Sequence, residues 1–173
     1  MIEGFYPTEE FDIQEMGSFM RRADIYGPLT DALAPPPESV NFEDYIIQPT
    51  TYTMAAMYGP HIVGYCMLVV RTGVAAEMQA GFHPQARGIV AKTFVSYCIA
   101  QAWKTKGLLA IWAFIAADNR PARQMAYALG FREEGRLRQS ITRAPQDYGG
   151  RHRMPGVYDL VCYATHRPAR LLP

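Results

Sequence analysis

The sequence carries almost no net charge, few cysteines and no long apolar run. Its formal net charge is +1 over 173 residues, which provides no general attraction to nucleic acid or to a membrane surface. No stretch approaches the roughly 18 consecutive apolar residues that indicate a membrane-spanning helix. The first residues also lack the basic start and apolar core of a secretory signal peptide. We therefore expect neither a nucleic-acid-binding protein nor a membrane-bound or exported one.

The three cysteines, Cys66, Cys98 and Cys162, lie far apart, each within an apolar segment, and no two form a C-x-x-C pair. This pattern favours buried free thiols over a disulfide framework, and we expect no metal site. Free thiols are typical of a reducing compartment, so the expected location is the cytoplasm.

Hydrophobic residues make up 49% of the chain and charged residues 19%, as in ordinary globular proteins. Residues 1–173 are therefore expected to form a single domain. Residues 1–48 are expected to form a helical N-terminal cap, because apolar residues recur at steps of three and four over 9–34 before a run of prolines. Three strands are expected next, at 50–58, 61–71 and 74–82.

The remaining sequence alternates helices and strands. A helix runs from Gly88 to Gly107, where the second glycine favours a helix end. A strand over 108–116, a helix over 119–130 and two strands at 131–142 and 157–165 follow. Strands that meander and then alternate with helices predict an α/β (α+β) fold, with a mixed sheet of about six to seven strands and helices on both faces.

Two segments hold residues that a plain scaffold does not need. In EMQAGFHPQARGIVAK, residues 77–92, a strand ends and a helix begins after Gly88. The start of a helix offers unpaired backbone amides and a partial positive charge, which together suit a phosphate group. Glycine at this point lets a ligand approach the backbone closely.

The second segment is ADNRPARQMAYALGFREEG, residues 117–135. Asn119 can cap the helix that follows it. Arg123 and Tyr127 are four residues apart, so they share a face that borders the apolar stripe of this helix. The residues alone leave two interpretations open: Tyr127 points into a cleft beside strand 108–116, or it is a half-buried core tyrosine and Asn119 only a cap.

Together the two segments resemble the GNAT superfamily of acyl-CoA-dependent N-acyltransferases over about residues 50–164. The second motif of that family is matched here by Asn119, Ala122, Tyr127, Leu129-Gly130-Phe131 and Gly135. Its phosphate motif, Gln/Arg-x-x-Gly-x-Gly/Ala, is matched by Gln85 and Gly88 but has Val90 at the last position. Within the superfamily the closing segments look most like the ribosomal-protein alanine N-acetyltransferase branch.

The resemblance implies that acetyl-CoA binds where two parallel strands splay apart, with Gly81 and Phe82 nearest the split. It implies that the loop with Gln85, and the amides of Arg87, Gly88, Ile89, Val90 and Ala91, hold the diphosphate. It places Asn119 on the pantetheine side and Arg123 near the phosphates of the cofactor. The β-branched side chain of Val90 is expected to crowd the diphosphate.

The same resemblance suggests catalytic roles. Tyr127 matches a tyrosine that many relatives use as general acid, and an amide near Phe82 would polarise the thioester. Glu77 is the first choice of general base and His83 the second, since histidine changes charge near neutral pH. The alternative for Glu77 is a surface charge at a strand edge, and the alternative for His83 is a loop residue without a catalytic role. As a base, either side chain could act through a water.

The expected function is therefore acetyl transfer from acetyl-CoA to an amine, with the acceptor flanked by residues 1–48 and a loop over 143–156. The alternative is a catalytically inactive GNAT-fold module that acts through protein–protein contacts. A homodimer is compatible with the resemblance, and the sequence does not identify the acceptor.

Overall fold

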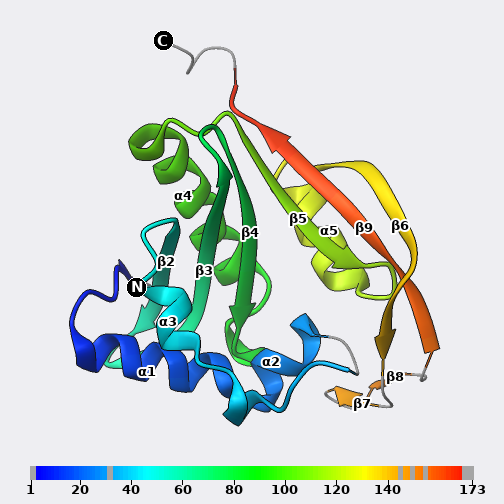
Figure 1. Ribbon diagram of the computed structural model, residues 1–173, viewed down its shortest axis with the longest axis horizontal. Coiled ribbons are helices and arrows are strands. Elements are labelled where there is room, and N and C mark those ends of the chain that lie inside the picture. Colours follow the sequence, from blue (N-terminus) through cyan, green and yellow to red (C-terminus); the bar gives the residue numbers. More distant parts are fainter. Residues whose placement is uncertain (1–2, 31–32, 144–145, 149–150, 154–155, 169–173) are drawn as a thin grey trace.

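Seven strands of this chain form one mixed sheet, in the order β1-β2-β3-β4-β5-β9-β6 (Figure 1). The structure is a computed structural model that describes residues 3–30, 33–143, 146–148, 151–153 and 156–168. The strands are β1 Glu3–Phe5, β2 Thr51–Tyr58, β3 His61–Thr72, β4 Ala75–Phe82, β5 Ala110–Ala116, β6 Arg132–Arg143 and β9 Gly156–His166. The helices are α1 Glu10–Arg21, α2 Ala23–Leu29, α3 Phe42–Ile46, α4 Ile89–Lys106 and α5 Arg120–Ala128, with short 3-10 turns at Pro37–Ser39 and Pro84–Ala86. The predicted α/β fold with helices on both faces of a mixed sheet is confirmed.

The helices lie in two layers. Figure 1 shows α4 and α5 behind the sheet and α1, α2 and α3 in front of it, so we call these its back face and its front face. Alternate residues of each strand point to opposite faces. The back core joins strand residues such as Ala76, Met78 and Ile111 to α4 and α5. The front core joins Met67 and its neighbours to α1, α2 and α3.

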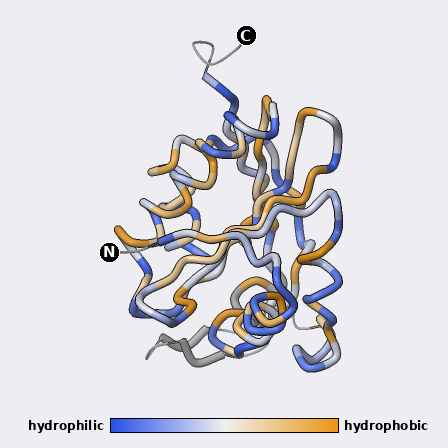
Figure 2. Tube along the Cα trace, turned by 90° about the vertical axis from the view of Figure 1, so that its left-hand side faces the viewer, coloured by the Kyte–Doolittle hydropathy of each residue, from blue (hydrophilic) through white to orange (hydrophobic). Residues whose placement is uncertain are grey.

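Figure 2 shows the molecule from the side, with both hydrophobic and hydrophilic residues on the helices. This mixture is expected of helices that cover a sheet with one face and meet solvent with the other. Within the described residues, no helix is both long and apolar enough to cross a membrane. Cys66 and Cys98 are buried free thiols, as predicted, whereas Cys162 is free but only half-buried.

The N-terminal segment differs in part from the prediction. The helix expected over 9–34 breaks at Arg22, whose backbone is extended with φ −56° and ψ 136°. The Arg22 guanidinium then binds the Asp24 carboxylate in the first turn of α2, with Nε 3.0 Å from Oδ1. Residues 3–5 are a strand rather than part of a helical cap, because they pair with residues 55–57 at the edge of the sheet.

The segment 143–156 was expected to be a loop. It contains two short antiparallel strands, β7 Gln146–Tyr148 and β8 Arg151–Arg153, which form a separate two-stranded sheet. The loop prediction is therefore wrong for these six residues (three in each strand). The pairing joins Gln146 to Arg153 and Tyr148 to Arg151 across the hairpin.

The parallel pair β4–β5 is short. Its register runs from Ala75 beside Ala110 to Glu77 beside Trp112 and covers three residue pairs. On the other side of β5, the antiparallel pairing with β9 covers seven pairs, as far as Ala116. β4 and β5 therefore part after Glu77 and Trp112, which confirms the predicted splayed pair.

Candidate active site

Gly81 and Phe82 lie at the end of β4 where it has parted from β5. Phe82 is buried in the back core, where its ring meets Phe94 of α4 edge-on at a centroid distance of 6.0 Å. Gly81 faces the front core, and a Cβ there would overlap the Tyr65 ring and Ile25 of α2. A larger residue at position 81 would therefore push α2 away from the end of β4.

A tight turn leads from β4 into α4. His83 begins this turn, and its Nδ1 accepts a hydrogen bond from the backbone amide of Gln85 at 3.4 Å. Gly88 ends the turn with φ 83° and ψ −128°, a conformation that side chains strongly disfavour. A Cβ built on Gly88 would have no atom within 4 Å, so its surroundings are open.

The first turn of α4 has features that suit an anion. No side chain caps this end of the helix, and the first amides of a helix have no intrahelical partner. Ile89 is 74% exposed, whereas Val90 is partly buried and packs against the back core. The side chain of Val90 thus packs inward, and the expected crowding of the diphosphate by Val90 stays a prediction.

Arg87 links this turn to the front layer. Its Nε donates to the carbonyl of Phe82 at 3.2 Å, and its Nη2 donates to the carbonyl of Asp24 in α2 at 3.1 Å. Its backbone amide is 3.4 Å from the carbonyl of Pro84 and is directed into the turn. The Arg87 side chain therefore fastens α2 to the end of β4, a role that the sequence did not predict.

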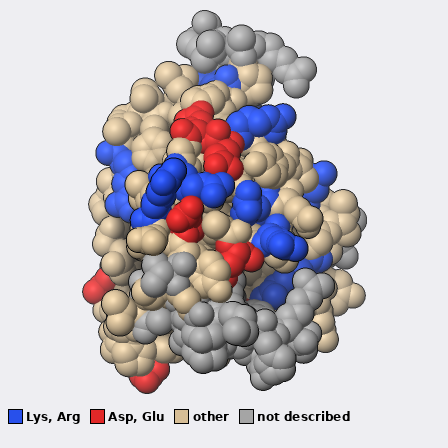
Figure 3. All heavy atoms as spheres, turned by 90° about the vertical axis from the view of Figure 1, so that its right-hand side faces the viewer, with Lys and Arg blue, Asp and Glu red and all other residues tan. Residues whose placement is uncertain are grey.

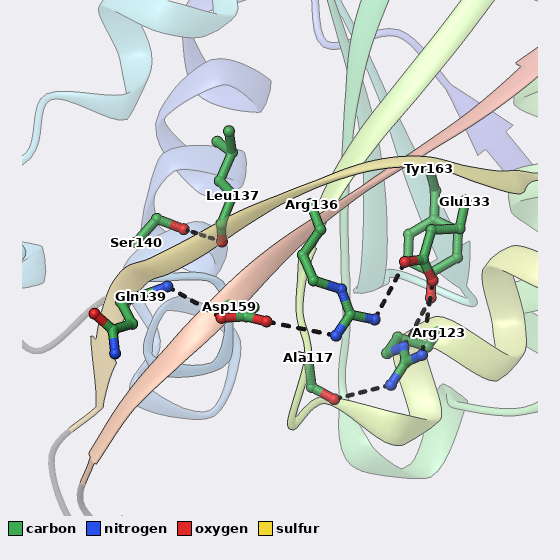
Figure 4. A network of polar contacts seen from close by, with 9 residues as sticks. All are labelled: Ala117, Arg123, Glu133, Arg136, Leu137, Gln139, Ser140, Asp159 and Tyr163. Carbon is green, nitrogen blue, oxygen red and sulfur yellow. Dashed lines mark hydrogen bonds and ion pairs between the residues drawn. The ribbon is translucent and has the colours of Figure 1, made fainter.

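On the other side of the parted strands, Asn119 caps α5. Its side-chain oxygen accepts a hydrogen bond from the amide of Ala122 at 3.3 Å. Arg123, one turn further on, is held by the second half of the sheet (Figure 4). Its Nε donates to the Tyr163 hydroxyl at 2.7 Å and its Nη1 to the carbonyl of Ala117 at 3.1 Å, and Glu133 lies 4.0 Å from its Nη2.

Tyr127 has one well-defined ring contact. Its ring stands at 90° to that of Tyr163, with centroids 5.3 Å apart, and the residue is 44% exposed. Tyr163 belongs to β9, which lies on the far side of β5 from β4. The contacts of Tyr127 and Arg123 are thus with β9, β6 and Ala117, which follows β5, and no described contact joins either residue to Gly81 or Phe82.

The two candidate bases have different surroundings. Glu77 lies in the last residue pair before the strands part, and its Oε2 accepts from Nη2 and Nε of Arg71 at 2.7 and 3.1 Å. His83 lies at the parted end instead. The pKa of the neighbouring Asp24 is lowered, chiefly by its bonds to Arg22 and least by the charge of His83. The turn that His83 begins is bonded to α2 through Arg87, whose Nη2 donates to the Asp24 carbonyl.

Trp112 and Phe114 form part of the surroundings that sequence reasoning missed. Both lie on the front face of β5, since Ile111, Ala113 and Ile115 pack into the back core. The alternation in the segment AIWAFIA, residues 110–116, was a signal that the two aromatic residues share one face.

Comparison with known proteins gives a consistent result. Residues 20–131 match the model of the acetyltransferase (GNAT) family. No curated protein matches the sequence.

Several solved structures share the fold. One is a spermidine N-acetyltransferase from Vibrio cholerae in complex with CoA and spermine, with a TM-score of 0.72, 16% identity and 95% of each chain covered. A ribosomal-protein-S5-alanine acetyltransferase from Vibrio fischeri has a TM-score of 0.71 and 14% identity, over 95% of this chain and 92% of that one. An acetyltransferase of the GNAT family from Streptococcus pneumoniae has a TM-score of 0.71 and 15% identity, over 96% and 100%.

Proposed function

Because the chain belongs to the GNAT family of acetyltransferases, we propose that its parted strands and the first turn of α4 hold acetyl-CoA. The protein is an acetyl-CoA-dependent N-acetyltransferase, and acetyl-CoA supplies the activated thioester. The observation that supports this site most strongly is that β4 and β5 pair over three residues only and then part. The backbone of β4 beyond Glu77 thereby has an edge that an extended amide-containing ligand can pair with.

The diphosphate is assigned to the start of α4. The amides of Ile89, Val90 and Ala91 point out of the first helical turn, and the open surroundings of Gly88 leave room for an anion. Each favourable charge contact at a helix start contributes ~0.3–1 kcal/mol where it is exposed. Gln85 precedes this turn, and Asn119 lies across the parting at the start of α5.

The proposed general base is His83 rather than Glu77. The carboxylate of Glu77 is engaged by Arg71 in a 2.7 Å ion pair at the paired end of the strands. His83 follows the parted end directly, and among the described residues only the amide of Gln85, at 3.4 Å, engages its Nδ1. Its role is to take the proton that the attacking amine loses, directly or through a water.

Tyr127 stays the proposed general acid for the leaving thiolate, although its ring contact with Tyr163 also suits a packing role. Tyr127→Phe separates the two, since phenylalanine keeps the ring contact and removes the hydroxyl. Loss of general acid catalysis typically lowers kcat by ~10²–10⁴. Unchanged turnover with unchanged affinity would assign Tyr127 to packing alone.

Arg123 was expected to meet the phosphates of the cofactor. Its contacts with Tyr163, Ala117 and Glu133 favour a different proposal, in which it fixes α5 against β9 and β6. We also propose that the protein is located in the cytoplasm, which its free cysteines support.

Calorimetric titration with acetyl-CoA and with CoA tests the site. Gly88→Ala should weaken binding at least about tenfold, because alanine at φ 83° strains the turn and its methyl group intrudes on the anion. Gly107→Ala is the matched control: it also has positive φ and open surroundings but lies at the other end of α4. Absence of binding to the unaltered protein at millimolar ligand would leave only the non-catalytic module.

A further inference from the structure

The front faces of β5, β9 and β6 form an apolar surface that no described helix covers (Figure 1). In register, Phe114 lies beside Cys162, and Cys162 lies beside Gly135. The next row places Ala116, Leu160 and Leu137 side by side. We call this surface the open apolar face, defined by Trp112, Phe114, Gly135, Leu137, Leu160 and Cys162; Ala116 and Ala164 of the same rows are buried.

The open apolar face is built of large side chains around small ones. Phe114 is 42% exposed and Leu137 53% exposed. In the register, Cys162 and Gly135 continue the row that begins at Phe114, and Leu160 lies beside Leu137 in the next row. Clustered exposed apolar residues of this kind mark binding surfaces on soluble proteins.

This face adjoins the parted strands. Trp112 is the last residue of β5 that pairs with β4, and Phe114 lies two residues further, where the strands have separated. The back of this region is filled by the core residues Ala113 and Ile115, which pack with α5 and α4. An acceptor therefore reaches the parting from the front, across Phe114.

The charges around the open apolar face do not suit a polycation. On the described front face of β4, β5, β9 and β6, the carboxylates are Glu77 and Glu134. Glu77 is paired with Arg71 at 2.7 Å, and Glu134 lies 2.7 Å from the Nε2 of His166. Figure 3 shows acidic and basic side chains interspersed on the adjoining edge of the molecule. A polyamine needs several unpaired carboxylates, one near each ammonium group.

We propose that the open apolar face binds the carbon skeleton of the acceptor, so that the substrate is a primary amine carrying an aromatic or branched aliphatic group. This rests on the proposed function of the parted strands. In the reaction the amine nitrogen forms a bond to the acetyl carbon as the carbon–sulfur bond breaks, and the proton lost by nitrogen ends on the CoA thiol. Phe114 is the specificity-determining residue, and polyamines are poor substrates.

The first test compares three probe amines at saturating acetyl-CoA: 2-phenylethylamine, ethylamine and spermine. We expect kcat/KM for 2-phenylethylamine to exceed that for each of the others by about tenfold or more, because only its ring gains from apolar burial. Spermine turnover equal to or above that of 2-phenylethylamine would overturn the proposal. So would failure of 2-phenylethylamine both to react and to bind the CoA complex.

The second test uses Phe114→Ala, with Leu109→Ala as the matched control. Leu109 is 40% exposed and precedes β5 at its paired end. Phe114→Ala should abolish the preference for 2-phenylethylamine over ethylamine and leave the Kd of acetyl-CoA unchanged, whereas Leu109→Ala should change neither. A tenfold preference that persists in Phe114→Ala would overturn the assignment.

Two further results are distinguishable from these. If the unaltered protein does not bind acetyl-CoA, the proposed function itself is refuted, rather than the proposed class of acceptor. A stable dimer in sedimentation analysis that Phe114→Asp converts to a monomer would assign the open apolar face to a second copy of the chain, and would overturn the proposal.

Discussion

The two halves of the sheet share one back core but differ in front. β2, β3 and β4 are covered in front by α1, α2 and α3, and Met67 at the centre of this half is 4% exposed. β5, β9 and β6 have no described helix in front, and Phe114 is 42% exposed. Large apolar side chains point forward in both halves, so composition alone does not distinguish a core from a binding surface. The covering layer does.

The largest expected effect is a loss of stability in the half of the sheet that the front helices cover. Met67→Ala should lower the free energy of unfolding by ~2–5 kcal/mol, because it leaves a cavity between β3 and the front helices. Phe114→Ala, the equivalent truncation in the open half, should cost less than half as much. Denaturant titration of both variants measures the difference, and equal losses would mean that the open face is also covered.

A smaller effect concerns a bulge that shapes the open half. Between Leu137 and Ile141, β6 has three residues opposite the single Asp159 of β9, and Gln139 adopts φ 49°. One Asp159 oxygen accepts the amide of Gln139 at 3.0 Å, and the other accepts Nη1 of Arg136 at 3.4 Å (Figure 4).

Asp159→Ala should therefore destabilise the protein by ~1–3 kcal/mol, since it leaves the bulge without its acceptor. It should also reduce amide protection in β6 before that in β3, as hydrogen exchange can detect. Arg138→Ala, which changes an exposed side chain of the same bulge, is the control. Uniform loss of protection across both halves would show that the bulge is not a local unit.

The smallest effect is acid dependence in the covered half. Arg21 binds Glu43 of α3, with Nη1 2.7 Å from Oε1, and this bond lowers the pKa of Glu43 from its usual value near 4.5. A lowered pKa in the folded state stabilises the protein above the unfolded pKa, and the contribution is lost as pH falls through the folded value.

Glu43→Gln should therefore cost ~1 kcal/mol at pH 7 and progressively less below pH ~4.5. Thermal unfolding of the two proteins across pH 3–7 measures the convergence. A stability difference independent of pH would assign Glu43 to packing instead of charge.

Local patterns were sufficient to predict most elements. Apolar runs and helix stops located β2, β3, β4, α4, β5 and α5 within a few residues, because each pattern is repeated over its whole element. The break at Arg22 and the strand Glu3–Phe5 were missed. The strand depends on pairing with β2, which is distant in sequence. At the break, Arg22 has an extended backbone and its guanidinium binds Asp24, which no apolar periodicity reveals.

The candidate site also has parts that local sequence predicts and parts that depend on distant contacts. The turn from His83 to Gly88 was predictable, because its residues are contiguous in the sequence. Glycine is also the residue that a tight turn with positive φ requires. The direction of Tyr127 and Arg123 was not, since it follows from how α5 rotates against Tyr163 of β9. The pairing of Glu77 with Arg71 also depends on the register between two strands.

The position of β9 has a consequence for how the molecule is made. It follows every other described strand in sequence, yet it lies between β5 and β6. While the chain is being synthesised, β6 leaves the ribosome with no strand to join, and β5 has a bare edge. The half of the sheet that we assign to acceptor recognition is thus completed last, so a nascent chain can assemble the covered half well before it can bind an acceptor.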